Sequence, residues 1–591
     1  MAGRKKDPIW IHFVEEPTLS GKGLKATCKS CGKQLMGLVA RMKKHIETCQ
    51  KEETEEDHLC ESESAQRSCR GNDSLAIVRK TGGQISSSTS QGPSMQTKRT
   101  HHNENNGDSE IKKKFHQTLV DTHLVKTNSN QKCILDEQVA RYIYATNSPF
   151  RQVDHPEFKK MVSLLRPGYK PPTHVQIGGD LLDTLYTAER EKCATCLEGK
   201  TVCLSLDGWS NIHNDPIICV AVTASLGEVY LVDTIDTSGH SHTADYLVHV
   251  AKAAVAKCER EFKCLVRSIV TDNTGNVRKM RSDLEKEDLN FITYGCSAHL
   301  LNLLAKDLQV PNVKEHVVEI VKYFRNNHFA HAKYKQEGGQ QLILPQDVRW
   351  NTTVDCLSAY IKYWPVLVKI CEENRTAIND NIYRKVMNVV IKRNAEDMLR
   401  CLKPVAIALD KVQKDSSTIS TAVDVWKSLK QSLEDENLNA DSMEKFSSRY
   451  HQVLDGAHFL AYLVDPRFCG QHLTADERSE ALSFANNRYK HIKSLFPIII
   501  KFQAKSTPFH NFLFDENVIS KVSPIDWWKM NINSDTTEVM DVIEPLLTAT
   551  ASSASVERIF STFGLVQSTL RNRLGTEKAA KLVFLFKILN K

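Results

Sequence analysis

The sequence predicts a multidomain α+β protein whose β-sheet core is interrupted by a large all-α insertion. Three observations predict this class. An apolar run at 202–209 (VCLSLDGW) begins a series of strand-like segments, residues 353–530 carry helical periodicity with few strand candidates, and residues 28–49 contain closely spaced cysteines and a histidine. At 591 residues the chain is long enough for about two to four domains.

The core is predicted from the order of its elements. A turn at 225–227 joins the second and third strands, and the first three strands together suggest an antiparallel meander. Helical segments precede the fourth and fifth strands, and such crossovers imply parallel pairing. The expected sheet is therefore mixed, of the ribonuclease-H type. The predicted strands are 202–209, 217–224, 228–237, 265–271 and 291–295, with a helix at 243–262 before the fourth.

Two acidic residues stand at the ends of separate strands of this sheet, Asp207 and Asp272. Carboxylates in such positions can converge at one edge, as a site that holds two divalent ions for phosphoryl transfer requires. The alternative is that each aspartate only caps a turn, which is the commoner role for either one alone. Their joint occurrence in this strand order favours the site.

Five short motifs, in this order, resemble the hAT superfamily of DNA transposases. They are DGWS at 207–210, VTDN at 270–273, CSAH at 296–299, RW at 349–350 and SASVERIFS at 553–561. The resemblance covers roughly residues 135–590.

The resemblance implies roles for six residues. Asp207, Asp272 and Glu557 would form a catalytic acidic triad. His299 would support the triad, and Arg349 and Trp350 would contact DNA, the tryptophan by stacking on a base flipped out of the duplex. The alternatives are a buried structural histidine and a core tryptophan.

A zinc site is predicted near the N-terminus. Cys28 and Cys31 are followed, after thirteen residues, by His45 and Cys49, which is the spacing of a closed tetrahedral site. A domain this small depends on the metal for its fold. The pattern resembles a BED-type zinc finger, a DNA-binding module. Three basic residues on the predicted helix of His45 are candidates for DNA contacts, the alternative being a solvated face: Arg41, Lys43 and Lys44.

Charge and composition narrow the functional class. The net charge is only +7, but residues 1–49 hold ten Lys and Arg against four Asp and Glu, as a phosphate-binding surface would. No run of about 18 apolar residues indicates a membrane span, and the first residues do not form a secretory signal. We therefore expect an intracellular, nuclear protein whose 17 cysteines are thiols or metal ligands.

The domain boundaries follow from changes in composition. Residues 51–115 are polar without apolar periodicity, and the last forty residues are apolar enough to require a partner. The expected domains are a BED-type zinc finger (1–50), a disordered linker (51–115), a helical region (116–200), the first part of a ribonuclease-H-like core (201–310), a mainly α-helical insertion (311–540) and a C-terminal dimerisation region that completes the core (541–591).

The sequence thus predicts a zinc-dependent, dimeric protein that binds double-stranded DNA, and it leaves the chemistry open. In one hypothesis the acids bind Mg²⁺ or Mn²⁺ and catalyse DNA cleavage and strand transfer, as a DDE-type transposase does. In the alternative, a domesticated transposase acts as a nuclear transcriptional regulator without catalysis. A third role, as a dimeric adaptor, leaves the basic N-terminal module unexplained.

Overall fold

The computed structural model describes residues 8–17, 24–36, 42, 45–46, 49, 127–287, 291–346, 350–568 and 574–591. The chain divides into two compact units, 1–112 and 113–591. The expected linker and four candidate DNA-contact residues lie outside the described residues: Arg41, Lys43, Lys44 and Arg349.

The first unit contains a three-stranded antiparallel sheet. Its small core consists of buried Phe13, Ala26, Cys28, Met42 and Cys49. Gly32 has a φ of 72°, and its amide donates to the carbonyl oxygen of Cys28 at 3.0 Å, which closes the turn after the second strand. The elements are η1 (Pro8–His12), β1 (Phe13–Pro17), β2 (Leu24–Cys28) and β3 (Gln34–Met36).

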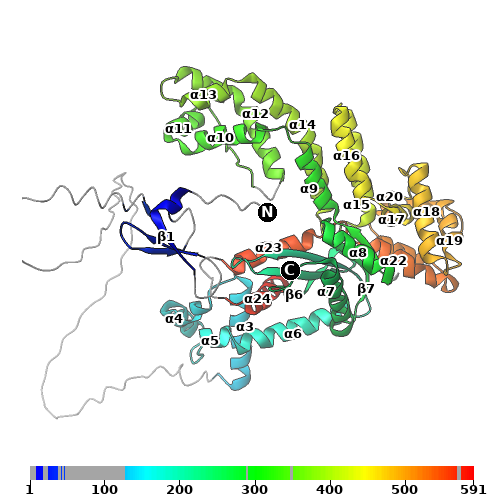
Figure 1. Cartoon of the computed structure of the whole chain (residues 1–591). Coiled ribbons are helices and arrows are strands. Elements are labelled where there is room, and N and C mark those ends of the chain that lie inside the picture. The colour runs from blue at the N-terminus through cyan, green and yellow to red at the C-terminus, as the bar shows by residue number, and fades with distance from the viewer. Residues whose placement is uncertain are drawn as a thin grey trace, which may run out of the picture. The chain divides into compact units, whose positions relative to one another are not determined.

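The second unit is built on a mixed sheet (Figure 1). The sheet has five strands in the order β6-β5-β4-β7-β8. The first three strands in sequence pair antiparallel, and β7 and β8 add in parallel, as the helical crossovers predict. The predicted fold class, helices and strands arranged around a β-sheet core, is therefore confirmed. The strands are β4 (Thr201–Ser210), β5 (Pro216–Thr223), β6 (Val229–Asp236), β7 (Leu265–Thr271) and β8 (Ile292–Gly295).

Helices from both ends of this unit pack on the sheet. The last two helices contribute apolar side chains to the same hydrophobic cluster as the strands, among them Val556, Phe563 and Val583. α23 contacts β4 and β5, and α24 contacts β6, α3 and α6. The helices of this layer are α3 (Ser129–Ala145), α4 (Pro156–Leu165), α5 (His174–Ile177), α6 (Asp180–Leu197), α7 (Ala244–Lys257), α8 (Gly275–Glu287), α23 (Ala554–Val566) and α24 (Thr576–Leu589), with η2 (Phe150–Asp154), η3 (Ser225–Gly227) and η4 (Cys258–Phe262) between them.

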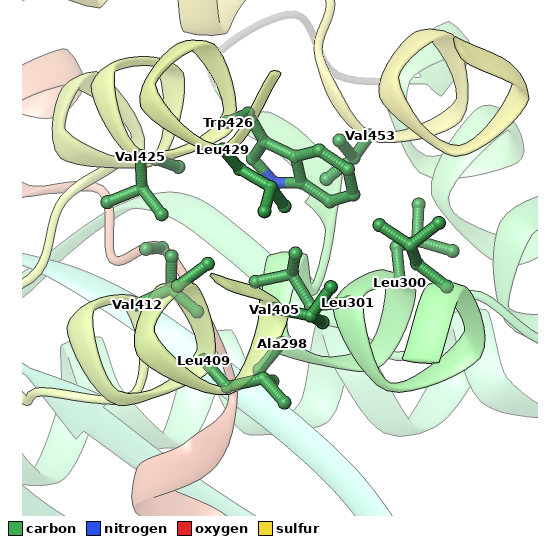
Figure 2. Close-up of a cluster of buried hydrophobic side chains, with 14 of the residues drawn as sticks. Ala298, Leu300, Leu301, Val405, Leu409, Val412, Val425, Trp426, Leu429 and Val453 are labelled. Atoms are coloured by element: carbon green, nitrogen blue, oxygen red, sulfur yellow. The ribbon is translucent and has the colours of Figure 1, made fainter. Parts of the chain in front are cut away.

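The segment between β8 and α23 is helical. Figure 2 shows its packing near the sheet, where α9, α14, α15 and α16 surround the indole of Trp426. Trp426 is fully buried, and its Nε1 donates to Ser297 Oγ at 3.1 Å. The helices are α9 (Ser297–Asp307), α10 (Val313–Asn326), α11 (His328–Gln336), α12 (Trp350–Glu373), α13 (Asp380–Val386), α14 (Val389–Val412), α15 (Ile419–Asp435), α16 (Ala440–Val453), α17 (Gly456–Val464), α18 (Ala475–Tyr489), α19 (Leu495–Gln503), α20 (Glu516–Ile519), α21 (Pro524–Asn531) and α22 (Met540–Thr548), with η5 (Asn511–Phe514) and η6 (Ser534–Val539).

Two long periodic stretches, 382–405 and 444–463, each contain a break. At the first break the Asn388 side chain accepts hydrogen bonds from the amides of the next helix, and Asp455 does so at the second. Gly456 follows at the second break, where an added Cβ would lie 2.6 Å from Phe484. The helical spacing of apolar residues continues across Asn388 and across Asp455, because the helices before and after each of these residues pack on the same core.

The segment 549–553 joins the helical part to the sheet. The amide of Ser297 donates to the carbonyl of Ala551 at 3.0 Å, and the amide of Ala551 donates to the carbonyl of Ser417 at 2.8 Å. Thr550 forms an isolated antiparallel bridge with Thr418. This segment therefore lies between α9, at the sheet, and the loop before α15.

Candidate functional site

The parallel pairing of β4 with β7 ends at the pair Ser205 and Val270. Asp207 lies two residues beyond that pair on β4, and Asp272 lies two residues beyond it, directly after the end of β7. Neighbouring strands lie about 4.8 Å apart, so this register brings the two acidic residues to one end of the ladder. β4 itself continues to Ser210 because its pairing with β5 continues, so Asp207 lies inside a longer strand than the sequence indicated.

The C-terminal part of the chain covers the face of β4 that carries Asp207. Side chains alternate along a strand, so Cys203, Asp207 and Trp209 share one face. Cys203 Sγ lies 3.4 Å from Thr550 Oγ1, and the Trp209 ring stacks on Phe560 at a centroid distance of 4.4 Å. Glu557, one helical turn before Phe560, is thereby brought into electrostatic contact with Asp207.

The three acidic residues share a partly buried environment. Burial, then the charge of Asp272 and more weakly that of Glu557, raise the pKa of Asp207 to about 7, although the Gly208 amide donates to its Oδ1 at 2.8 Å. Burial also raises the pKa of Glu557. Like charges gathered in this way favour a bound cation, which would lower the cost of ionising all three.

A buried arginine, which the sequence did not single out, holds the end of β7. Arg281 on α8 is 8% exposed, and its guanidinium donates to Thr271 Oγ1 at 2.6 Å and to Asn273 Oδ1 at 3.2 Å. It also donates to the carbonyl oxygen of Asp272. The Asp272 side chain accepts from the hydroxyl of Thr274 at 3.0 Å. Arg281 looks like an ordinary helix charge in the sequence, so only the fold reveals this contact.

His299 and Cys296 lie at the start of α9, on the same side as Asp272. Burial lowers the pKa of His299, and the charge of Asp272 acts against that change. The neutral imidazole is therefore favoured at pH 7. Cys296 is fully buried, and its Sγ accepts from the amide of Ser553 at 3.4 Å, in the segment that leads to Glu557.

A cavity of about 510 Å³ adjoins the two aspartates. Its apolar lining includes Leu247 and Met280, and its polar lining includes His242 and Asn276 besides Asp207 and Asp272. The Asn276 amide donates to the carbonyl of His242 at 2.9 Å, which ties the loop after β6 to α8.

Trp350 is not among the residues that line this cavity. It begins α12, half-buried, with Lys314 Nζ 5.9 Å from its ring centroid. Its neighbour Arg349 lies outside the described residues, so the Arg-Trp pair stays a prediction from the sequence.

The four N-terminal ligand candidates come together. One ligand atom from each of Cys28, Cys31, His45 and Cys49 lies within 4.8 Å of all the others. A tetrahedral zinc site with bonds of about 2.3 Å has ligand atoms about 3.8 Å apart, so the set has the size for one zinc ion. Among the described residues this is the one group of three or more such ligands that could hold a metal ion. The charges of Asp272 and Glu557 both act on Asp207, but these three carboxylates are not such a group.

The Cys28 thiol is already prepared for a metal. Burial opposes its ionisation, but backbone hydrogen bonds at Cys31 and Ser30, together with hydrogen bonds to the His45 and Cys31 side chains, lower its pKa to about 6. A hydrogen bond with Cys31, followed by burial and then repulsion by the Cys31 charge, raises the pKa of Cys49 to about 12. A divalent ion relieves that repulsion.

Comparison with known proteins finds matching families for two segments of the second unit. Residues 509–589 match the hAT family C-terminal dimerisation region, and residues 172–324 match a domain family described as of unknown function, DUF659. Two Zea mays proteins, "Putative AC transposase" and "Putative AC9 transposase", are each 24% identical over 244 residues. The chain belongs to the hAT superfamily.

The matched part of this hAT protein is limited in extent. It covers 38% of this chain and 30% and 29% of the two maize proteins, so the chain spans less than a third of their length. The dimerisation region includes α23, with Glu557, and α24. Among the helices that the structure describes, none has the length and apolar character needed to cross a bilayer.

Proposed function

We propose that this hAT protein binds DNA and cleaves and transfers DNA strands at a divalent-metal site formed by Asp207, Asp272 and Glu557. The observation that carries the proposal is the register of β4 and β7, which supports a shared site because both aspartates follow the last pair, Ser205 and Val270, by two residues. The sheet order, with three antiparallel strands followed by two parallel ones, supports a ribonuclease-H-like core.

The residues fit Mg²⁺ or Mn²⁺, which prefer carboxylate oxygens. Asp207 interacts with both other acids, which makes it the candidate to hold two ions, with Asp272 and Glu557 completing the set. When bound, the ions would activate the attacking hydroxyl or water and stabilise the phosphoryl group in transfer. The protein itself would position the carboxylates. Arg281 fixes the backbone of Asp272, and α23, which carries Glu557, packs against β4.

We further propose that the first unit is a BED-type zinc finger that holds Zn²⁺ and binds double-stranded DNA in the nucleus. Its donor set of three thiols and one imidazole suits zinc. Dimerisation through the C-terminal region would place two acidic sites in one assembly, as cleavage at two DNA ends requires.

The test is a strand-transfer assay with the full chain, Mg²⁺ or Mn²⁺, and a pool of candidate DNA ends. We expect joined products from the wild type, none from Asp207→Asn or Glu557→Gln, and unchanged DNA binding by both variants. Asp236→Asn, an exposed acid on the edge strand β6, is the matched control and should retain activity. Products that persist in the Asp207→Asn variant would refute the catalytic role.

One observation favours the second candidate, a domesticated regulator. The zinc-ligand group and the acidic site lie in separate compact units, so loss of the acids would leave the proposed DNA-binding unit intact. A wild-type protein that binds DNA tightly and yields no products with any metal or end would support the regulator instead.

A further inference from the structure

A cavity with basic walls lies in the helical insertion, apart from the acidic site. Helices α10 to α13 gather in one lobe (Figure 1), and within it α10, α11 and the loop 339–342 line a cavity of about 450 Å³. Arg325, His331 and Lys335 line this cavity, together with Tyr334 and the loop that begins at Gly339.

The positive charge in the cavity is not neutralised nearby. Within the described ranges, neither Arg325 nor Lys335 has an ion-pair partner. The acids closest to them in sequence are engaged elsewhere, Glu319 with Lys385 and Glu337 with Lys369. Two exposed cations without a local counter-ion attract an anion from solution.

A buried hydroxyl belongs to the same cavity. Tyr334 is 1% exposed, its ring lies between those of Phe324 and Tyr363 at centroid distances of 6.4 and 5.9 Å, and its hydroxyl has no hydrogen-bond partner in the structure. Buried tyrosine hydroxyls normally have one. A Cβ on Gly339 would lie 2.3 Å from the Tyr334 ring, so only bare backbone can close the cavity there.

His331 lines the cavity in a fixed orientation. Its Nδ1 donates to the carbonyl oxygen of Phe324 at 3.1 Å, so this nitrogen carries the proton in the neutral ring. The cavity therefore combines a guanidinium, an ammonium and an unpartnered hydroxyl, all of which can donate to one oxyanion.

We propose that this cavity binds a phosphate of the DNA backbone. The proposal rests on the proposed function for the identity of the polyanion. Lys314, which covers Trp350, lies at the other end of α10, eleven residues before Arg325. Eleven helical residues span about 16 Å, or about five base-pair steps of 3.4 Å, so one duplex along α10 reaches both ends of the helix.

The first test measures the salt dependence of DNA binding by the zinc-loaded full chain. Fluorescence anisotropy with a labelled duplex compares wild type, Arg325→Gln/Lys335→Gln, and the control Lys490→Gln/Lys493→Gln, which removes two exposed charges between α18 and α19. We expect the cavity variant to bind about tenfold more weakly and to reduce the slope of log K against log salt by about one to two. The control should keep the wild-type slope. A cavity variant with the wild-type slope, or an equal change in the control, overturns the proposal.

The second test removes only the hydroxyl. Tyr334→Phe should weaken duplex binding and leave the melting temperature equal or higher, because the deleted group has no partner within the protein. If the Tyr334→Phe variant binds the duplex with wild-type affinity, the Tyr334 hydroxyl does not contact the phosphate.

Inorganic phosphate separates the two sources of the same anion. If phosphate raises the melting temperature of wild type but not of the cavity variant while DNA slopes stay equal, the cavity is a small-anion site and the DNA assignment fails. These readouts need no cleavage, so failure of the acidic triad in strand transfer is distinguishable from failure of this site.

Discussion

The indole of Trp209 stacks on the ring of Phe560, with centroids 4.4 Å apart and planes inclined by 28°. Trp209 lies two positions after Asp207 on β4, and Phe560 lies three positions after Glu557 on α23. One aromatic contact therefore sets the distance between two acids that are 350 residues apart in the sequence.

Phe560→Ala should loosen α23 from the sheet. We expect a loss of about 2 kcal/mol in the free energy of unfolding, because the ring is only partly buried, together with weaker Mn²⁺ binding. Denaturant unfolding and Mn²⁺ paramagnetic resonance would measure both. Leu565→Ala on the same helix is the control, since this side chain is 61% exposed and should change stability by less than about 0.5 kcal/mol. Equal effects of the two substitutions would contradict the role of the aromatic contact.

Arg281→Gln should leave three oxygens without their donor at the end of β7. We expect a loss of about 2 to 4 kcal/mol in unfolding free energy, since these oxygens are partly or fully buried. Arg281→Lys should recover part of the stability and little of the Mn²⁺ affinity, because an ammonium cannot span the three acceptors. Lys279→Gln, exposed on the same helix, should change neither quantity.

Asp207 should make the metal-free protein less stable as pH rises. Because its pKa is raised from 3.8 to about 7, the folded chain keeps a proton that the unfolded chain releases above about pH 4. Stability therefore falls between about pH 4 and 7 and levels off above that range. Asp207→Asn should abolish this fall and stabilise the metal-free protein at pH 8 by on the order of 2 kcal/mol.

Melting temperatures at pH 5 and pH 8 would check this prediction. Asp236→Asn serves as a control of opposite sign, since hydrogen bonds from the Ser238 side chain and amide lower the pKa of Asp236. The prediction fails if the wild-type protein is equally stable at both pH values and the Asp207→Asn variant melts at the same temperatures. Ionisation of Asp207 would then not destabilise the metal-free protein.

Cys28→Ser should unfold the first unit and leave the second unit folded, because the two are separate. We expect zinc content to fall from one ion per chain to none, DNA affinity to drop by at least tenfold, and the main calorimetric transition to stay in place. Cys133→Ser, an exposed cysteine on α3, is the control and should retain the zinc. Zinc retained by the Cys28 variant would exclude this ligand set.

The sequence predicted best what depends on neighbouring residues. The strand order and the mixed sheet were predicted, because apolar runs and turns are local signals, and β7 was placed at its observed bounds. The hAT relationship was identified from motif order and is confirmed. The helix breaks at Asn388 and Asp455 were missed, although both are common N-cap residues, because the apolar period runs through them.

Long-range contacts were beyond local reasoning. Glu557 was included only through the family motif, since nothing near it in sequence indicates that α23 returns to β4. Arg281 and the Tyr334 hydroxyl were not predicted, because burial decides their meaning and burial depends on packing. The zinc spacing, the acidic triad and the DNA contacts at Arg41, Lys43, Lys44 and Arg349 stay predictions.

The position of Glu557 on the second-last helix gives the site an order of assembly during synthesis. Asp207 and Asp272 leave the ribosome 285 residues or more ahead of it, which at about 5 to 20 residues per second is a delay of roughly 15 to 60 s. Nascent chains hold two acids beside an uncovered face of β4, and the third arrives only with α23. A growing polypeptide therefore completes the proposed metal site only when α23 has been made.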